Sequence, residues 1–254
     1  MNASGDSLIP SDANRRMFDR LAPRYDLLNR LLSLGLDRRW RRRAVEALAP
    51  RDGEHHLDIG CGSDDMALEI LRRAPGCRVI GLDPSQQMLA LAAEKAGRAG
   101  VGDRLTLAAG DACALPFADG SFAGITSAFA LRSFTDRGRA FREMRRVLAP
   151  GGRVVLLELT GPRHPLLRAG YWLHTRGLGM VLALLVCGKI GAYRFLLRSV
   201  DRFPPAEDVL GELTAAGFTE PRSRPLSAGI TTIYTAAAKK TPAVFFSPRA
   251  ALLS

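Results

Sequence analysis

Residues that bind metals or form disulfide frameworks are scarce in this chain. Its 254 residues include four cysteines and four histidines, without a C-x-x-C pair, zinc-ligand spacing or an H-E-x-x-H arrangement. We therefore expect neither a bound metal nor a disulfide framework. Reduced thiols, as in a cytoplasmic protein, fit this usage better.

Signals for secretion and for crossing a membrane are also missing. The first ten residues, MNASGDSLIP, lack a basic start followed by an apolar core, so we expect no secretory signal. The longest apolar run covers residues 178–187, whereas a membrane-spanning helix needs about 20. This run could lie in a membrane interface, wall a tunnel for a lipid tail or form an ordinary core helix.

Acidic residues are too few to balance the basic ones. The 36 Lys and Arg residues outnumber the 25 Asp and Glu residues, for a net charge of +11. Such an excess favours a negatively charged partner, unless arginine-rich usage alone accounts for it. No aromatic and basic motif of RNA-binding proteins accompanies the charge, so we expect no nucleic-acid partner. Arginines around Trp40, at positions 38, 39 and 41–43, suit an anionic membrane with an aromatic anchor, or else a solvated helix face.

Apolar patterning predicts strands that alternate with helices along most of the chain. Strands are expected over residues 55–60, 77–83, 105–111, 122–131, 153–159 and 230–238. Helices are expected over residues 65–74, 85–97, 136–148 and 206–218. This order predicts an α/β protein with a mostly parallel, doubly wound sheet covered on both faces. Ligands of such sheets bind at the carboxyl ends of the strands.

The length of the chain suits one large domain with added segments. We expect a flexible N-terminus over residues 1–14, a main domain over 15–238 and a loose tail over 239–254. Within the main domain, residues 15–50 would form a helical cap with breaks at Pro23 and Gly35. Residues 162–203, which are apolar and aromatic with scattered Gly and Arg, would form an insertion for substrate or membrane.

The stretch LDIGCGSDDM, residues 57–66, predicts a ligand loop between a strand and a helix. Gly60 and Gly62 would let a ligand approach the backbone at the start of that helix. Asp83 ends the next strand, where a carboxylate can accept both ribose hydroxyls, and Asp111 after the third strand could accept an adenine amino group. Only part of a G-x-G-x-x-G motif is present, so an adenosine cofactor without phosphates fits better than a dinucleotide.

Longer stretches resemble one known family. They are MFDRLAPRYDLLNRLLSLGLDRRWRR, GDACALPFADGSFAGITSAFALRSFTD, REMRRVLAPGGRVVLLELTGP and YRFLLRSVDRFP, followed by AGF and LSAGI. In this order they are similar to the ubiquinone/menaquinone biosynthesis C-methyltransferases, which are class I S-adenosylmethionine-dependent enzymes, and they cover roughly residues 15–238. The resemblance implies a Rossmann-like, mostly parallel seven-stranded sheet with helices on both faces and an N-terminal helical cap.

The resemblance also implies a reaction. The cofactor would be S-adenosyl-L-methionine, and the acceptor a ring carbon of a polyprenylated quinol, most closely demethylmenaquinol. That carbon becomes nucleophilic when the neighbouring phenol loses its proton. Because the acceptor is a bilayer lipid, the resemblance implies a cytoplasmic enzyme in peripheral contact with the inner face of an anionic membrane. A homodimer is left open.

Matching positions imply roles for individual residues. Cofactor-binding residues would be Asp58, Gly60, Gly62, Ser63, Asp83, Pro84, Asp111, Ala112 and Ser127. Arg132 could stabilise a developing phenolate, or could instead form a buried ion pair. Tyr25 could close over the cofactor or orient the quinol, and Asp26 could handle a proton. Capping or packing of an N-terminal helix is the alternative for both.

The chain departs from the family pattern at several positions. Asp64 stands where glycine is usual, and its carboxylate could either obstruct the cofactor or point outward as a helix N-cap. We expect cofactor binding that survives but is weakened. Ala130, Ser133, Ala228 and Tyr234 also differ from the usual residues, which leaves open another aromatic or lipid acceptor. A catalytically silent scaffold for quinone-synthesis enzymes is a further alternative.

Overall fold

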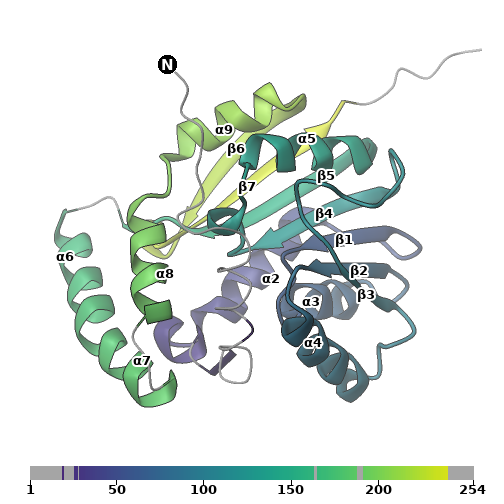
Figure 1. Cartoon of the computed structure of the whole chain (residues 1–254). Helices are drawn as coiled ribbons and strands as arrows, with labels where there is room; N and C mark the ends of the chain where they lie inside the picture. Colours follow the sequence, from purple (N-terminus) through teal and green to yellow (C-terminus); the bar gives the residue numbers. More distant parts are fainter. Residues whose placement is uncertain (1–18, 20–25, 28, 163–164, 188–190, 240–254) are drawn as a thin grey trace, which may run out of the picture.

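The protein is built around one twisted seven-stranded sheet (Figure 1). This computed structural model describes residues 19, 26–27, 29–162, 165–187 and 191–239. Residues 1–14, Tyr25 and the tail beyond residue 239, for which predictions were made, therefore lie outside the described residues.

The strand order is β3-β2-β1-β4-β5-β7-β6. Five strands run parallel: β1 (His55–Ile59), β2 (Arg78–Asp83), β3 (Leu105–Ala109), β4 (Phe122–Ala128) and β5 (Leu148–Leu159). β7 (Thr231–Ala238) is antiparallel to both of its neighbours, β5 and β6 (Phe218–Leu226). The predicted mostly parallel seven-stranded sheet is confirmed, and the order reverses beside β1, where a ligand is expected.

The edge strand β6 did not follow from its pattern. Its sequence, FTEPRSRPL, contains two prolines and no apolar alternation, and residues 216–218 were expected to continue a helix instead. Proline is tolerated in an edge strand, because one side of that strand needs no ladder hydrogen bonds. β6 therefore forms by pairing with β7 rather than through its own propensity.

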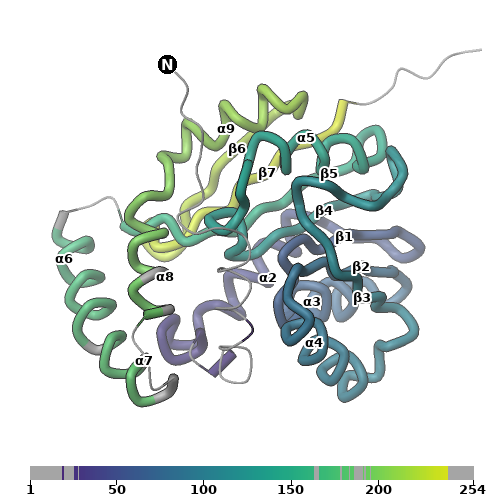
Figure 2. The backbone as a smooth tube through the Cα atoms, in the orientation of Figure 1, coloured from purple at the N-terminus to yellow at the C-terminus, as the bar shows by residue number. Residues whose placement is uncertain are grey.

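Helices cover both faces of the sheet (Figures 1 and 2). One face carries α2 (Leu36–Leu48), α3 (Asp65–Arg73) and α4 (Gln86–Ala99). The other carries α5 (Arg137–Val147) and α9 (Ala206–Ala215). Each layer has its own core, with Trp40 and Met66 in the first and Phe141 and Leu213 in the second. The expected doubly wound arrangement is thus present.

Three further helices lie beyond the carboxyl ends of the parallel strands, at the left of Figure 1. α6 (Pro165–Leu173) continues through a π-helical turn (His174–Leu178) into α7 (Gly179–Cys187), and α8 (Gly191–Asp201) follows. Tyr193 of α8 packs with Leu32 and Met180 in a small separate core. No helix among the described residues is long and apolar enough to cross a membrane.

Trp40 does not anchor the protein to a membrane, so that prediction is wrong. Its side chain is only 4% exposed, and its indole N–H donates a hydrogen bond to Ser227 Oγ at 2.8 Å. The reason is helical periodicity, because Trp40 shares the sheet-facing side of α2 with Ala44 and Leu48. Arg41 is also buried beside it, whereas Arg38, Arg39, Arg42 and Arg43 are exposed.

Candidate functional site

A cavity of about 690 Å³ opens at the carboxyl ends of the first four strands. Pockets of this size are typical of sites for small molecules and cofactors. Its walls come from the loops after β1 to β4, from the start of α4 and from Asp19 near the N-terminus. The lining includes six of the predicted cofactor residues: Gly60, Gly62, Asp83, Pro84, Asp111 and Ala112.

The two glycines of the loop after β1 have different functions. Both have positive φ angles, +65° for Gly60 and +55° for Gly62. A Cβ on Gly60 would lie 2.4 Å from Cβ of Ala130, so this glycine is required by packing within the protein. A Cβ on Gly62 would meet no protein atom within 4 Å. The space beside Gly62 is therefore open to a ligand in the cavity.

Asp83 fixes the loop from inside the cavity. Its Oδ2 accepts the Gly62 N–H and its Oδ1 accepts the Ser85 N–H, both at 2.9 Å. Burial raises the pKa of Asp83 in spite of these two hydrogen bonds, which act in the opposite direction. Each carboxylate oxygen has a second lone pair, which a ribose hydroxyl could use.

Asp111 lies just after β3, on a more exposed part of the wall. One of its oxygens accepts the Cys113 N–H at 2.9 Å, and Ala112 is buried beside it. Leu82, Met88 and Phe134 supply apolar surface in the same cavity. Carboxylates with apolar walls suit the hydroxyls, amino group and flat ring of an adenosine.

The charge of the lining decides between classes of cofactor. Asp19, Asp83 and Asp111 line the cavity, and no lysine or arginine is among the described residues that do so. A pyrophosphate would be repelled by such walls, whereas a sulfonium or ammonium group would be attracted. Together with the open space beside Gly62, this donor set fits S-adenosylmethionine.

Three predicted cofactor residues lie behind the cavity instead of lining it. Asp58 is 1% exposed and accepts a hydrogen bond from Thr126 Oγ1 at 2.7 Å. The hydroxyl of Ser127 donates to the Ile59 carbonyl at 2.7 Å, and Ser63 faces the outer side of the loop, where it contacts Asp26. These residues can order the loop, but the structure gives them no surface in the cavity.

Arg132 forms a buried ion pair, as the alternative prediction for this residue had it. Its Nε lies 2.9 Å from Glu158 Oε1, although the N–H is poorly directed at that oxygen, and its Nη2 donates to the Phe129 carbonyl at 3.1 Å. The side chain is 7% exposed and Glu158 is fully buried. Nη1 has no hydrogen-bond partner among the described residues. Arg132 itself does not line the cavity, whereas Phe129 and Ser133 on either side do.

Asp26 is placed outside the cavity with both carboxylate oxygens engaged. Ser63 Oγ donates to Oδ1 at 2.6 Å and Lys95 Nζ lies 2.5 Å from Oδ2. A carboxylate held in this way is poorly suited to moving a proton at the reacting centre. The second prediction for the N-terminal segment, Tyr25, lies outside the described residues.

Asp64 takes neither of the two expected positions. It occupies the N-cap position of α3 without a side-chain capping bond, and it is 0% exposed, so the outward-facing alternative is wrong. It does not line the cavity either. Its carboxyl group lies under the loop, where a Cβ on Gly81 would come within 2.5 Å of Oδ2. The glycine of β2 thus provides the space that Asp64 fills.

Sequence reasoning missed several residues of the wall. Asp19 lines the cavity and accepts a hydrogen bond from the Ser85 hydroxyl at 2.5 Å. Phe129 has a positive φ of 61°, which turns the chain into the cavity after β4. Ser85 could have been identified, because it is the N-cap of α4 directly after Asp83 and Pro84. No sequence signal marks Asp19.

Comparisons with known proteins agree with this geometry. Residues 9–238 match the model of the ubiE/COQ5 methyltransferase family. The chain belongs to the ubiE/COQ5 methyltransferase family. A relative from Thermus thermophilus named demethylmenaquinone methyltransferase is 45% identical over 203 residues, which is 80% of this chain and 91% of the relative. One from Geobacter sulfurreducens, ubiquinone/menaquinone biosynthesis C-methyltransferase UbiE, is 40% identical over 87% of this chain and 86% of the relative.

Solved structures confirm the fold of this methyltransferase. A SAM-dependent methyltransferase from Aquifex aeolicus superposes with a TM-score of 0.57 at 14% identity, over 78% of this chain and 88% of that chain. The predicted class I methyltransferase fold, the family and S-adenosylmethionine as its cofactor are thus confirmed. Gly62, Asp83 and Asp111 line the cavity that fits this cofactor.

Proposed function

We propose that this enzyme methylates a ring carbon of a polyprenylated quinol, most closely demethylmenaquinol, with S-adenosylmethionine as methyl donor. The observation that carries the proposal is the 45% identity, over 80% of the chain, to a relative named for that activity. The cavity supports it, because its walls combine acidic groups for a cationic cofactor with apolar surface. When bound, S-adenosylmethionine supplies an electrophilic methyl group.

In this proposal, Arg132 stabilises negative charge on the ring oxygen of the acceptor. Glu158 and the Phe129 carbonyl hold its guanidinium in place, and the buried Nη1 is a donor without a hydrogen-bond partner in the described part of the chain. A preorganised cation in a dry site stabilises a developing phenolate far better than one in water. The proposal is supported by its neighbours Phe129 and Ser133, which line the cavity.

A second candidate is methylation of another lipophilic phenol. Ala130 and Ser133, two of the positions that depart from the family pattern, both line the cavity. A change of wall residues is how a fixed site acquires a new acceptor. The two candidates share the cofactor and differ only in the ring that reacts.

One experiment separates these candidates. Purified protein is incubated with labelled S-adenosylmethionine and a panel of reduced quinones and simpler phenols, and extracted lipids are analysed for label. We expect label in reduced demethylmenaquinone and little in phenols without a second ring. Label only in other phenols would establish the second candidate, and cofactor binding without any labelled product would support the scaffold alternative.

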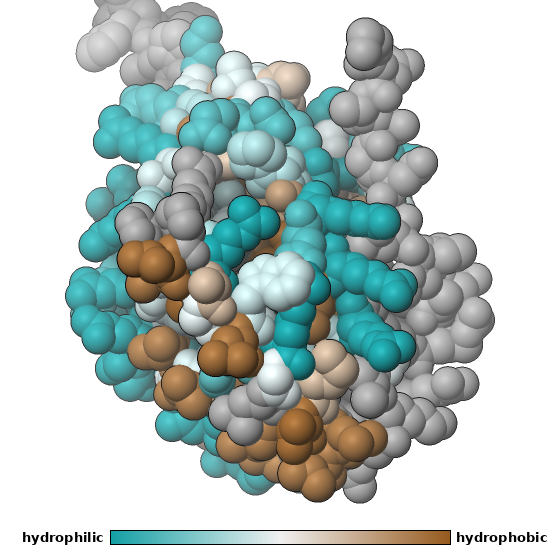
Figure 3. All heavy atoms as spheres, turned by 90° about the vertical axis from the view of Figure 1, so that its left-hand side faces the viewer, coloured by the Kyte–Doolittle hydropathy of each residue, from teal (hydrophilic) through white to brown (hydrophobic). Residues whose placement is uncertain are grey.

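We also propose that the enzyme works in peripheral contact with a membrane, at its cytoplasmic face. The support is the apolar surface of α6 and α7, where large side chains are strongly exposed: Leu166 at 79%, Leu173 at 77% and Leu185 at 76%. Figure 3, which looks onto this side, shows a dense apolar patch at the bottom, where α7 lies, with hydrophilic side chains beside it. Monomeric soluble proteins rarely expose such patches without a binding role.

Charge complements this apolar surface. Arg168 on α6 and Arg194 and Arg198 on α8 are exposed, and the chain carries a net charge of +11. Anionic headgroups attract such residues while leucine side chains enter the interface. Trp172, 39% exposed on α6, would take the interfacial role that was first predicted for Trp40.

A further inference from the structure

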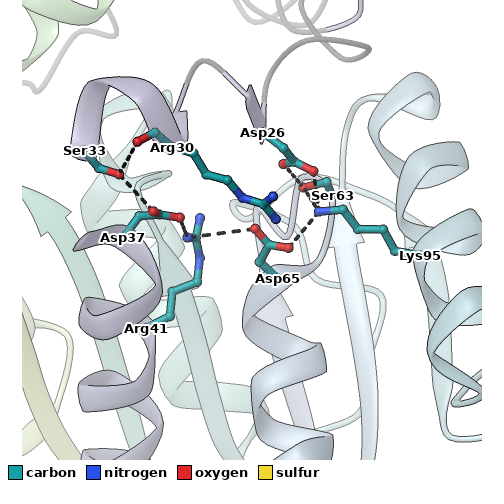
Figure 4. Close-up of polar contacts among 8 residues, drawn as sticks. All are labelled: Asp26, Arg30, Ser33, Asp37, Arg41, Ser63, Asp65 and Lys95. Atoms are coloured by element: carbon teal, nitrogen blue, oxygen red, sulfur yellow. Dashed lines mark hydrogen bonds and ion pairs between the residues drawn. The ribbon is translucent and has the colours of Figure 1, made fainter. Parts of the chain in front are cut away.

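A polar cluster outside the cavity connects the N-terminal part of the chain to the cofactor loop (Figure 4). Its central members are Asp26, Ser63, Asp65 and Lys95. They come from three places in the chain: the N-terminal helical residues 26–27, the loop and start of α3, and the C-terminal half of α4.

Lys95 is the hub of this cluster. Its ammonium group contacts Asp26 Oδ2 at 2.5 Å, Asp65 Oδ1 at 2.7 Å and Ser63 Oγ at 2.9 Å. Of its three N–H donors, two form hydrogen bonds to Asp65 and Ser63, and the contact with Asp26 is an ion pair. The side chains are largely shielded from solvent, with exposures of 18% for Lys95, 28% for Asp26 and 26% for Asp65.

The cluster is tied to α2 on its other side. Arg41 Nη1 lies 2.6 Å from Asp37 Oδ2 and 3.9 Å from Asp65 Oδ2, and Ser33 Oγ donates to Asp37 Oδ1 at 2.9 Å. Burial alone would raise the pKa of Asp65, but the charges of Arg41 and Lys95 outweigh burial and lower it. Asp65 is therefore ionised. The N-terminal helical residues are held at Asp26 by Lys95 and Ser63, and at Ser33 by Asp37 of α2.

The connection to the cofactor runs through Ser63. Its neighbour Gly62 lines the cavity and is hydrogen-bonded to Asp83 on the inner side of the loop. Ser63, 4% exposed, is held on the outer side by Asp26 and Lys95. The loop thus has polar contacts on both sides: Asp83 on the cavity side, and Asp26 and Lys95 on the outer side.

We propose that Lys95 is a positioning residue for the cofactor, which locks the glycine loop and the N-terminal stretch together through Asp26, Ser63 and Asp65. Without its charge, the carboxylates of Asp26 and Asp65 would face each other beside the loop, and among the described residues only Arg41, 3.9 Å from Asp65, and the more distant Arg30 would offset their repulsion. Their repulsion would separate residue 26 from residue 63 and loosen the loop that must be ordered for binding. The inference rests on cofactor use alone and not on the identity of the acceptor.

Affinity for S-adenosylhomocysteine, measured by titration calorimetry, tests the proposal. We expect Lys95→Ala to weaken binding about tenfold or more, which corresponds to about 1.4 kcal/mol. Lys95→Arg, which keeps the charge, should recover part of the loss. The matched control is Arg98→Ala, which removes a cation from the same helix whose ion pair among the described residues is with Glu94, at 3.2 Å; it should leave the affinity unchanged.

Hydrogen exchange of residues 26, 27 and 29–33 gives a readout that is independent of binding strength. In the ligand-free protein, Lys95→Ala should speed exchange there, whereas Arg98→Ala should not. Asp26→Asn, which removes one carboxylate and keeps its size, provides a second variant should Lys95→Ala fail to fold. Unchanged affinity in both folded variants would overturn the proposal, as would an equal loss in Arg98→Ala. Neither result depends on which quinol is methylated.

Discussion

At the scale of single residues, Asp64 shows how a departure from the family pattern is tolerated. Burial, reinforced by the nearby Asp58 carboxyl, raises the pKa of Asp64 well above its ordinary value, and the nearby Ala67 N–H offsets only a part of this. Burial also raises the pKa of Asp58, to about 7. Burial thus favours the protonated form of Asp64, which lessens its repulsion of the carboxylate of the cofactor. Its φ of +67° is the backbone reason that glycine is usual there.

The buried carboxyl predicts a pH-dependent stability. The folded protein keeps a proton that the unfolded chain loses above the ordinary pKa of 3.8, so the free energy of unfolding should fall as the pH rises above about 4. The slope is at most about 1.4 kcal/mol per pH unit for one group. Asp64→Asn should therefore gain about 1–3 kcal/mol over the parent protein at pH 8, and much less at pH 5.

Urea unfolding at pH 5 and pH 8 measures this difference. Asp103→Asn is a suitable control, because the Asp103 side chain is 81% exposed and its replacement should change little at either pH. A gain for Asp64→Asn that is equal at both pH values would show that the Asp64 carboxyl is not held neutral.

Asp64 also allows a prediction about the cofactor. Because its carboxyl lies under the loop and outside the cavity, Asp64→Gly should change the affinity for S-adenosylhomocysteine by less than about threefold. Calorimetric titration of both proteins measures this. A much tighter variant would show that the carboxylate obstructs the cofactor after all.

At the scale of elements, α6 and α7 differ from every helix packed on the sheet. They expose seven large apolar side chains: Leu166, Leu167, Trp172, Leu173, Val181, Leu184 and Leu185. α2, α3 and α5 instead bury their apolar faces against strands. A helix pair whose apolar side chains face outward needs another surface to cover it.

Membrane binding should therefore depend on this helix pair. Leu185→Asp should lower binding to vesicles that contain anionic lipid about tenfold or more. The change replaces apolar surface that the membrane would bury by a negative charge that the anionic headgroups repel. Thr214→Asp is the control, since it adds the same charge to an exposed position of α9 on a different layer. Vesicle flotation measures both, and equal binding by the two variants would contradict the proposal. A parent protein that stays soluble and dimerises through the patch would assign the surface to a second copy instead.

At the scale of the whole molecule, one site is assembled from loops of four strands, a helix start and the N-terminal segment. A ligand that binds only the folded state stabilises it by about 2.7 kcal/mol at a hundred times its dissociation constant. S-adenosylhomocysteine should therefore raise the unfolding midpoint of this protein.

Asp83→Asn should abolish most of that increase. The change keeps the size of the side chain, but it removes the charge and one acceptor from the group that holds Gly62 and Ser85. Thermal unfolding with and without ligand measures it, with Asp103→Asn as the control that keeps the full increase. Ligand stabilisation of Asp83→Asn equal to that of the parent protein would place the cofactor elsewhere.

The local sequence pattern was sufficient to predict most of the strands and the helices that pack on the sheet. It was also sufficient to identify the strand-end residues Gly62, Asp83 and Asp111. The spacing of apolar residues and the residues that start or end a helix or strand are properties of neighbouring residues, so they can be recognised in the sequence alone. The strand β6 could not be recognised, because its residues pair only through their partner β7.

Tertiary structure alone decided how the charged and large side chains are used. Arg132 meets Glu158, Lys95 meets Asp26 and Trp40 meets Ser227, each pair far apart in the chain. Whether Asp64 faces water, the cavity or the core depended on the space left by Gly81 on the next strand. Burial and pairing are properties of two surfaces brought together, and the energy of a charge depends on both. The sequence could therefore single out Arg132, Trp40 and Asp64, but it could not show the partner or the burial of each.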